Sequence, residues 1–71
     1  MSMSNGKALS EFMEKIAEAQ ALLGELQAHV DEHLDVSPEN VTWGTAGNAG
    51  YIVEKLRDIS DWTFKRGEYA E

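Results

Sequence analysis

Apolar residues recur at heptad spacing through the first half of the chain, and this repeat restricts the fold more than any other feature of the sequence. Two sets of four positions, three residues apart, carry it over four consecutive heptads. The first set is Leu9, Ile16, Leu23 and Val30, and the second is Phe12, Ala19, Leu26 and His33. A repeat of about 3.5 residues is typical of a helix that packs along another helix. The sequence therefore predicts a long helix over residues 6–34 with one continuous apolar seam.

Further apolar residues widen this face beyond the seam. Met13 and Leu34 flank it on one side and Leu22 flanks it on the other. Because one neighbouring helix covers a seam of two heptad positions, the wider face requires more than one neighbour. Gly24 lies inside the predicted helix, where it costs up to about 1 kcal/mol relative to Ala. This cost favours an interpretation in which a bulky side chain lies against the backbone at Gly24.

A short corner is predicted after the first helix. Pro38 disfavours the helical conformation of Ser37, so the helix must end before that residue. Ser37 is then expected to cap a single helical turn over residues 38–42, with Pro38 in its first position.

A second helix is predicted over residues 46–66. Thr45 or Asn48 is expected to cap its start, and the pair Lys65-Arg66 followed by Gly67 is typical of a helix end. Its inner stripe consists of Ala49, Ile52, Leu56, Ile59 and Thr63, flanked by Val53, Ser60 and Phe64.

These elements predict an all-α fold, an antiparallel helical hairpin that forms a single domain over residues 1–71 with frayed ends at 1–5 and 68–71. A chain of 71 residues buries only about 60% of its unfolded surface. It contains no cysteine, so no disulfide adds to this small core. Small folds without such a link commonly associate. We therefore expect a homodimer in which two hairpins form a four-helix bundle.

The acidic balance of the chain restricts its partners. Thirteen acidic residues against six Lys and Arg give a net charge of −7, which opposes direct binding to nucleic acid or to an anionic membrane. The same charge favours a protein partner with a basic surface. The apolar runs are far shorter than the roughly 18 residues that span a bilayer, and Met1–Lys7 lacks the pattern of a signal peptide. We therefore expect a cytoplasmic protein.

No catalytic residue and no cofactor is predicted, because the chain offers no evident pocket and no nucleophile motif. His29 and His33 are the candidate metal ligands, since they lie four residues apart on the predicted helix and match the H-x-x-E-H pattern of a class of zinc proteases. A zinc site needs at least one more protein ligand. The two histidines therefore form at most half of a metal site.

Glycines recur every third residue around the start of the second helix, at Gly44, Gly47 and Gly50. A phosphate-binding loop combines free backbone N–H groups with Lys or Arg, and none of these bases lies between Lys15 and Lys55. Close packing of another helix, or a bent helix start, is the favoured interpretation.

Two aromatic residues lie on the face of the second helix opposite its apolar stripe. Tyr51 and Trp62, with Lys55 and Asp58 between them, form a strip about 16 Å long, which we call the outer strip. Exposed aromatic residues are enriched in protein interfaces, so the outer strip is a predicted contact, either with a second copy of the chain or with a different protein. Trp43 is expected to cover the last apolar layer at the end of the helix pair, and it is the remaining candidate for partner binding.

The function that fits these features is that of a small acidic interaction or regulatory protein without catalytic activity, acting as a homo-oligomeric helical bundle. One alternative is an acidic inhibitor that imitates nucleic-acid phosphate and occupies the basic groove of a DNA- or RNA-binding protein. A second alternative is a metal-binding helical bundle that uses His29 and His33.

Overall fold

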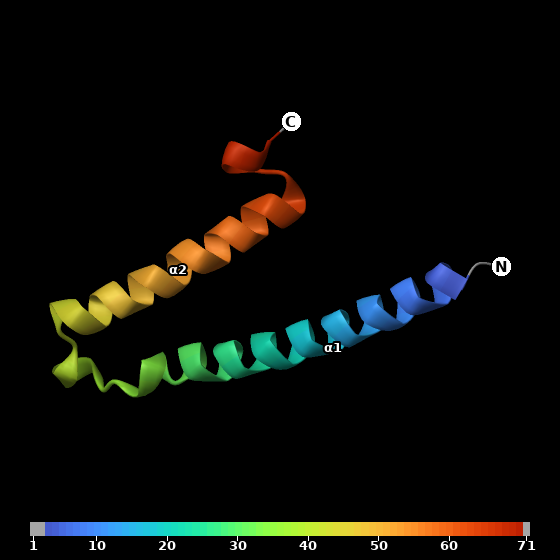
Figure 1. Ribbon diagram of the computed structural model, residues 1–71. Coiled ribbons are helices and arrows are strands. Elements are labelled where there is room, and N and C mark those ends of the chain that lie inside the picture. The colour runs from blue at the N-terminus through green and yellow to red at the C-terminus, as the bar shows by residue number, and fades with distance from the viewer. Residues whose placement is uncertain (1–2, 71) are drawn as a thin grey trace. The chain divides into compact units, whose positions relative to one another are not determined.

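The computed structural model describes residues 3–70, which are helical over most of their length and contain no strand (Figure 1). The elements are α1 (Met3–Asp31), the 3₁₀ turns η1 (His33–Asp35) and η2 (Pro38–Asn40), α2 (Trp43–Phe64) and the 3₁₀ turn η3 (Gly67–Tyr69). The chain divides into two compact units, Met1–Asp35 and Val36–Glu71. The prediction of an all-α chain with two helices joined by a short corner is confirmed.

The predicted frayed ends fall partly on residues 1, 2 and 71, which lie outside the described residues. Within the described part, Met3 is the first residue of α1, whereas the sequence predicted a start at residue 6. At the other end, η3 includes Glu68 and Tyr69.

In the first unit, α1 has 29 residues and is therefore about 43 Å long. An ion pair forms on its outer face, where Lys15 Nζ lies 3.6 Å from Glu11 Oε2. Near its end, Gln27 Nε2 donates to Asp31 Oδ1 over 2.9 Å. Contacts of this kind between exposed residues one turn apart contribute only about 0.2–0.5 kcal/mol each. The stability of α1 therefore depends on the burial of its apolar face.

The first helix ends at Asp31, and the predicted end at Leu34 is wrong, because the backbone becomes left-handed there. His33, Leu34 and Asp35 have φ values of 57°, 56° and 60°, and we call these three residues the left-handed turn. For L-residues this conformation costs about 1–2 kcal/mol per residue, and glycine is the residue that usually adopts it. The heptad pattern continues through this segment, but the helix does not.

Pro38 sets the corner at the predicted place. Ser37 is extended, with φ −69° and ψ 148°, and η2 begins at Pro38. Asn40 N–H donates to Ser37 O over 2.8 Å, and Val41 N–H donates to Pro38 O over 3.4 Å. The Ser37 side chain makes no capping hydrogen bond, so its predicted role as a cap is wrong. Backbone hydrogen bonds hold this turn instead.

Thr42 caps α2, and the expected caps Thr45 and Asn48 lie inside the helix. Thr45 N–H donates to Thr42 Oγ1 over 3.2 Å, and Thr42 N–H donates to Thr45 Oγ1 over 2.8 Å. This reciprocal arrangement satisfies two N–H groups that the first turn of a helix leaves free, with Thr45 in the role that Glu or Gln usually has. Trp43 is consequently the first residue of α2.

Residues 65–69 fold back after the end of α2, and we call this segment the C-terminal hook. Lys65 is left-handed, with φ 58°, and its N–H donates to Asp61 O. Arg66 N–H donates to the same carbonyl over 2.8 Å. The sequence placed the helix-ending left-handed residue at Gly67, but Lys65 has that role and Gly67, also left-handed with φ 57°, begins η3.

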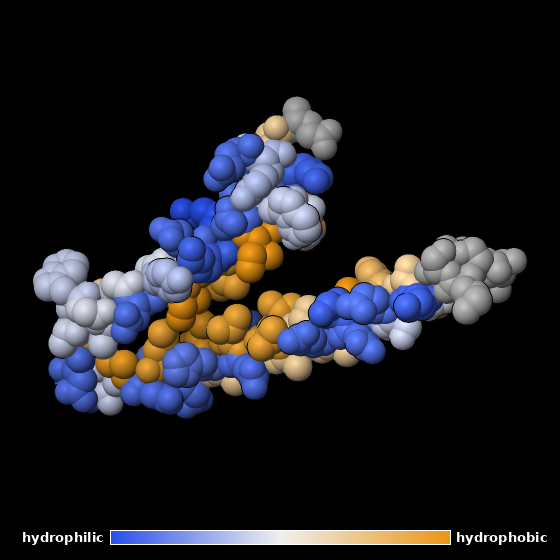
Figure 2. Space-filling view, viewed as in Figure 1, coloured by the Kyte–Doolittle hydropathy of each residue, from blue (hydrophilic) through white to orange (hydrophobic). Residues whose placement is uncertain are grey.

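Neither unit encloses a core of its own. Among residues 6–70 no side chain is buried, and apolar side chains are open to solvent on both helices (Figure 2). Ile16 and Leu26, the most shielded of the large apolar side chains of α1, are each still 39% exposed. A helix cannot bury its apolar face against itself, so a stable fold requires that another element cover these faces.

Candidate interaction surfaces

The apolar face of α1 spans about 140° of the helix circumference at 100° per residue, with Leu26 and Met13 near its two edges. Its large side chains are Leu9, Phe12, Met13, Ile16, Leu23, Leu26 and Val30. Gly24 lies beside this face, and a Cβ built there would meet nothing within 4 Å. No described side chain of the first unit makes the expected contact with Gly24.

The apolar stripe of α2 is similarly wide and open. Ile52 is half-buried, and Leu56, the most shielded of the large exposed apolar residues of α2, is surrounded by exposed neighbours. These neighbours are Val53, Ile59 and Phe64. Between Ile59 and Phe64 the stripe spans about 140° of the circumference.

The outer strip forms on α2, and the structure shows what each of its residues contacts. Lys55 Nζ lies 5.1 Å from the centroid of the Tyr51 ring, within the range of a cation–π contact. The Tyr51 and Trp62 side chains are 61% and 57% exposed. These two rings are therefore available to a partner in the single chain.

The C-terminal hook contacts the other half of the outer strip. Tyr69 Oη donates to Asp58 Oδ1 over 2.9 Å, and Lys65 Nζ lies 5.8 Å from the centroid of the Trp62 ring. Arg66 pairs with Asp61 at an Nε–Oδ1 distance of 3.5 Å and donates to Ser60 Oγ. A frayed end was predicted over residues 68–71, because no periodic pattern relates Tyr69 to a residue eleven positions earlier.

The contact with Asp58 changes the acidity of the tyrosine. The hydrogen bond to the Asp58 carboxylate, followed by desolvation and the charges of Asp58, Glu68 and Asp61, raises the pKa of Tyr69 above its ordinary value of 10.0. A neutral phenol can donate this bond and a phenolate cannot, so the hook contact requires the protonated form.

Trp43 lies apart from the outer strip. It precedes Tyr51 by eight residues, which corresponds to about 12 Å along the axis and about 80° around it. Its side chain is 92% exposed, and its expected position over the last apolar layer of the helix pair stays a prediction. With Val41, Thr42 and Ala46 it lines a shallow apolar hollow of about 240 Å³.

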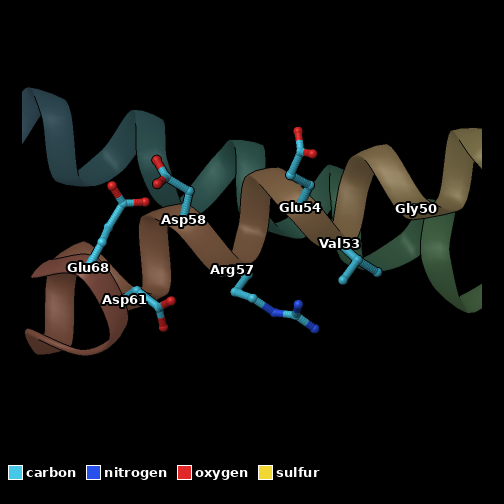
Figure 3. A pocket seen from close by; sticks show the side chains of 7 residues that line it. All are labelled: Gly50, Val53, Glu54, Arg57, Asp58, Asp61 and Glu68. Atoms are coloured by element: carbon cyan, nitrogen blue, oxygen red, sulfur yellow. The ribbon is translucent and has the colours of Figure 1, made fainter.

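A second hollow, of about 350 Å³, lies along α2 and the hook (Figure 3). Its charged lining residues are Glu54, Arg57, Asp58, Asp61 and Glu68, and the remaining ones are Gly50 and Val53. Glu54, Asp58 and Glu68 extend to one side of α2, whereas Arg57 and Asp61 extend to the other (Figure 3). The five charged side chains therefore do not all lie on one side of the helix.

His29 and His33 do not form the predicted pair on one helix. His29 is in the last turn of α1, whereas His33 belongs to the left-handed turn beyond its end. His29 Nδ1 instead lies 3.8 Å from Asp35 Oδ2. In the described part of the chain, no group of three or more His, Asp or Glu residues is placed to hold a metal ion.

The chain matches no protein family model, no curated protein and no solved structure. Of the helices in residues 3–70, none combines the length and the apolar character needed to cross a bilayer.

Proposed function

We propose that this protein is a small interaction module without catalytic activity, which folds as an antiparallel hairpin and associates with a second copy into a four-helix bundle. The observation that supports it best is the absence of a buried side chain among residues 6–70, together with one wide apolar face on each helix. A monomer that left these faces open would lack the main favourable term of folding.

The width of the α1 face favours two neighbouring helices over one. A helix with a single neighbour needs a seam of two heptad positions, whereas each helix of a four-helix bundle contacts two others. The α2 stripe of the same chain supplies one neighbour, and a helix of the second copy supplies the other. Full burial of a large aliphatic or aromatic side chain contributes about 1.5–3 kcal/mol. The seven large apolar side chains of this face, with Leu22 beside it, make this a strong driving force for association.

Sedimentation velocity over micromolar to millimolar concentrations tests the association. Leu26→Ala removes a side chain from the proposed interface, and Glu25→Ala, one residue earlier on the outer face, is the matched control. We expect Leu26→Ala to raise the dissociation constant at least tenfold, because truncation of a covered leucine costs about 2–5 kcal/mol. Glu25→Ala should change it less than twofold. A stable, folded monomer at every concentration would overturn the proposal.

The outer strip is proposed as the contact for a different protein, one with a basic surface. Its rings remain exposed on the side of α2 away from the apolar stripe. Affinity capture from native cytosol followed by mass spectrometry tests this contact, with Trp62→Ala as the disrupting variant and Glu25→Ala, on the outer face of α1, as the control. Equal recovery of partners by both variants would remove the outer strip from the proposed function.

The acidic inhibitor is a second candidate, favoured by the carboxylates of Glu54, Asp58 and Glu68 on one side of α2 (Figure 3). Binding of this kind to a basic groove weakens steeply with added salt and competes with nucleic acid. If a captured partner binds DNA or RNA, release of that nucleic acid by the protein distinguishes the two functions. Simultaneous binding of both to the partner excludes the inhibitor.

A further inference from the structure

The left-handed turn consists of residues that are poorly suited to its backbone. His33, Leu34 and Asp35 have φ values between 56° and 60°. Asp and His tolerate this region better than most residues, whereas a bulky residue such as Leu34 is an outlier there. Left-handed residues other than glycine normally occur singly. Three in succession therefore need compensation from their surroundings.

Two polar contacts join the turn to the end of α1. Asp35 N–H donates to Glu32 O over 3.0 Å. His29 Nδ1 lies 3.8 Å from Asp35 Oδ2, and the two side chains are 47% and 79% exposed. An ion pair that is this long and this exposed contributes little. These polar contacts therefore hold the turn only weakly, although Leu34 is half-buried in it.

A right-handed continuation of α1 is available to the same residues. Pro38 restricts Ser37 directly, which leaves the residues before Ser37 free to be helical. The N–H groups of His33, Leu34 and Asp35 would then donate to the carbonyls of residues 29–31, which otherwise lie among the unsatisfied groups of a helix end. Leu34 would follow Val30 by one turn and extend the apolar face of α1.

We propose that the left-handed turn is a two-state element, left-handed in the free chain and right-handed when a second copy covers the apolar face of α1. The change to the right-handed state rests on the self-association proposed above. A partner shifts such an equilibrium only through contacts that differ between the two states. Leu34 provides this difference, because it joins the covered face only in the right-handed state.

Asp35→Gly and Asp35→Ala form a matched pair for testing the switch. Both variants remove the carboxylate, and with it the contact to His29, so they differ only in the Cβ. Alanine disfavours the left-handed state by about 5- to 30-fold relative to glycine, and it also favours the right-handed helix. We expect Asp35→Ala to associate at least fivefold more tightly than Asp35→Gly. The pair Glu25→Ala and Glu25→Gly, inside α1, controls for ordinary helix propensity and should show a smaller difference.

Amide hydrogen exchange measured by NMR provides the second measurement, which separates the two proposals. In the dimer, the His33 and Leu34 amides should be protected, and in dilute chain they should exchange freely. A dimer in which these amides remain unprotected overturns the switch and leaves the association intact. If the chain stays monomeric, the proposal of self-association is wrong. The two-state proposal then predicts that the His33 and Leu34 amides are better protected in monomeric Asp35→Ala than in monomeric Asp35→Gly. Equal exchange in the two monomeric variants overturns it.

Discussion

Alanine at two glycines should change stability in opposite directions. Gly47 lies inside α2, and a Cβ built on it would meet nothing within 4 Å. Because glycine costs about 0.8–1 kcal/mol relative to alanine in a helix interior, Gly47→Ala should raise the free energy of unfolding by about that amount. For a chain of this size the gain corresponds to an increase of about 4–8 °C in Tm.

Gly67→Ala should have the opposite effect. Gly67 has a φ of +57°, and a Cβ there would lie 2.9 Å from Asp61 Oδ2. The left-handed conformation costs an alanine about 1–2 kcal/mol. The carboxylate that the Cβ would displace is the one that pairs with Arg66. We expect the C-terminal hook to loosen, with a loss of about 1–2 kcal/mol wherever the hook contributes to the unfolding transition.

Urea unfolding followed by far-UV circular dichroism, at one fixed chain concentration, measures both changes. Gly50→Ala repeats the first substitution one turn along the helix, since its Cβ also meets nothing within 4 Å. A loss of stability in Gly47→Ala would refute the reasoning from open space and would show that a neighbouring chain approaches this backbone closely. A gain in Gly67→Ala would refute the left-handed geometry of the hook.

Three further predictions concern the cap of α2, the Tyr69–Asp58 contact and the net charge of the chain. Thr42→Ala should destabilise α2 by about 1 kcal/mol through loss of the capping box. Ser37→Ala should have no measurable effect on the free energy of unfolding, because Ser37 makes no capping bond. Equal effects of the two substitutions would contradict the assigned caps. Since the folded pKa of Tyr69 is raised above 10.0, the Tyr69–Asp58 contact should be fully present below pH 10 and lost as the pH rises through the folded pKa. Tyr69→Phe should remove this alkaline loss of stability. Identical profiles of unfolding free energy against pH for the two chains would exclude the contact. Two copies that each carry a net charge of −7 repel one another, so the dissociation constant measured by sedimentation should fall as ionic strength increases to about 0.15 M. An increase in the dissociation constant would contradict self-association through apolar faces.

The helices could be predicted from the sequence because their signals are periodic and local. The heptad repeat from Leu9 to Val30 and the stripe around Leu56 gave two helices, and Pro38 gave the corner between them. The caps were harder to place. Thr42 and Thr45 form a capping box with Thr45 in place of the usual Glu or Gln, and the spacing of two threonines three residues apart was the available signal.

The candidate surfaces were predictable only in part. Helical periodicity placed Tyr51, Lys55, Asp58 and Trp62 on one strip of α2. The partner of Asp58 was not predictable, because Tyr69 reaches it through two left-handed residues, Lys65 and Gly67. Whether a lysine becomes left-handed at a helix end depends on the competition among several weak terminal contacts, which a sequence pattern does not resolve.

The wrong end of the first helix has a different cause. A heptad repeat records which residues are apolar along the contact with another helix, whereas the end of an isolated helix depends on its own hydrogen bonds and backbone energies. The repeat continues to His33 and Leu34, but α1 of the single chain ends at Asp31. These two observations are consistent if the repeat reflects the associated chain and the left-handed turn reflects the free one. The same reasoning applies to Gly24, whose Cβ position is open although glycine weakens the helix. A close neighbour in the assembly would explain why glycine occupies this position, and Gly24→Ala would then weaken association even where it stabilises the isolated helix.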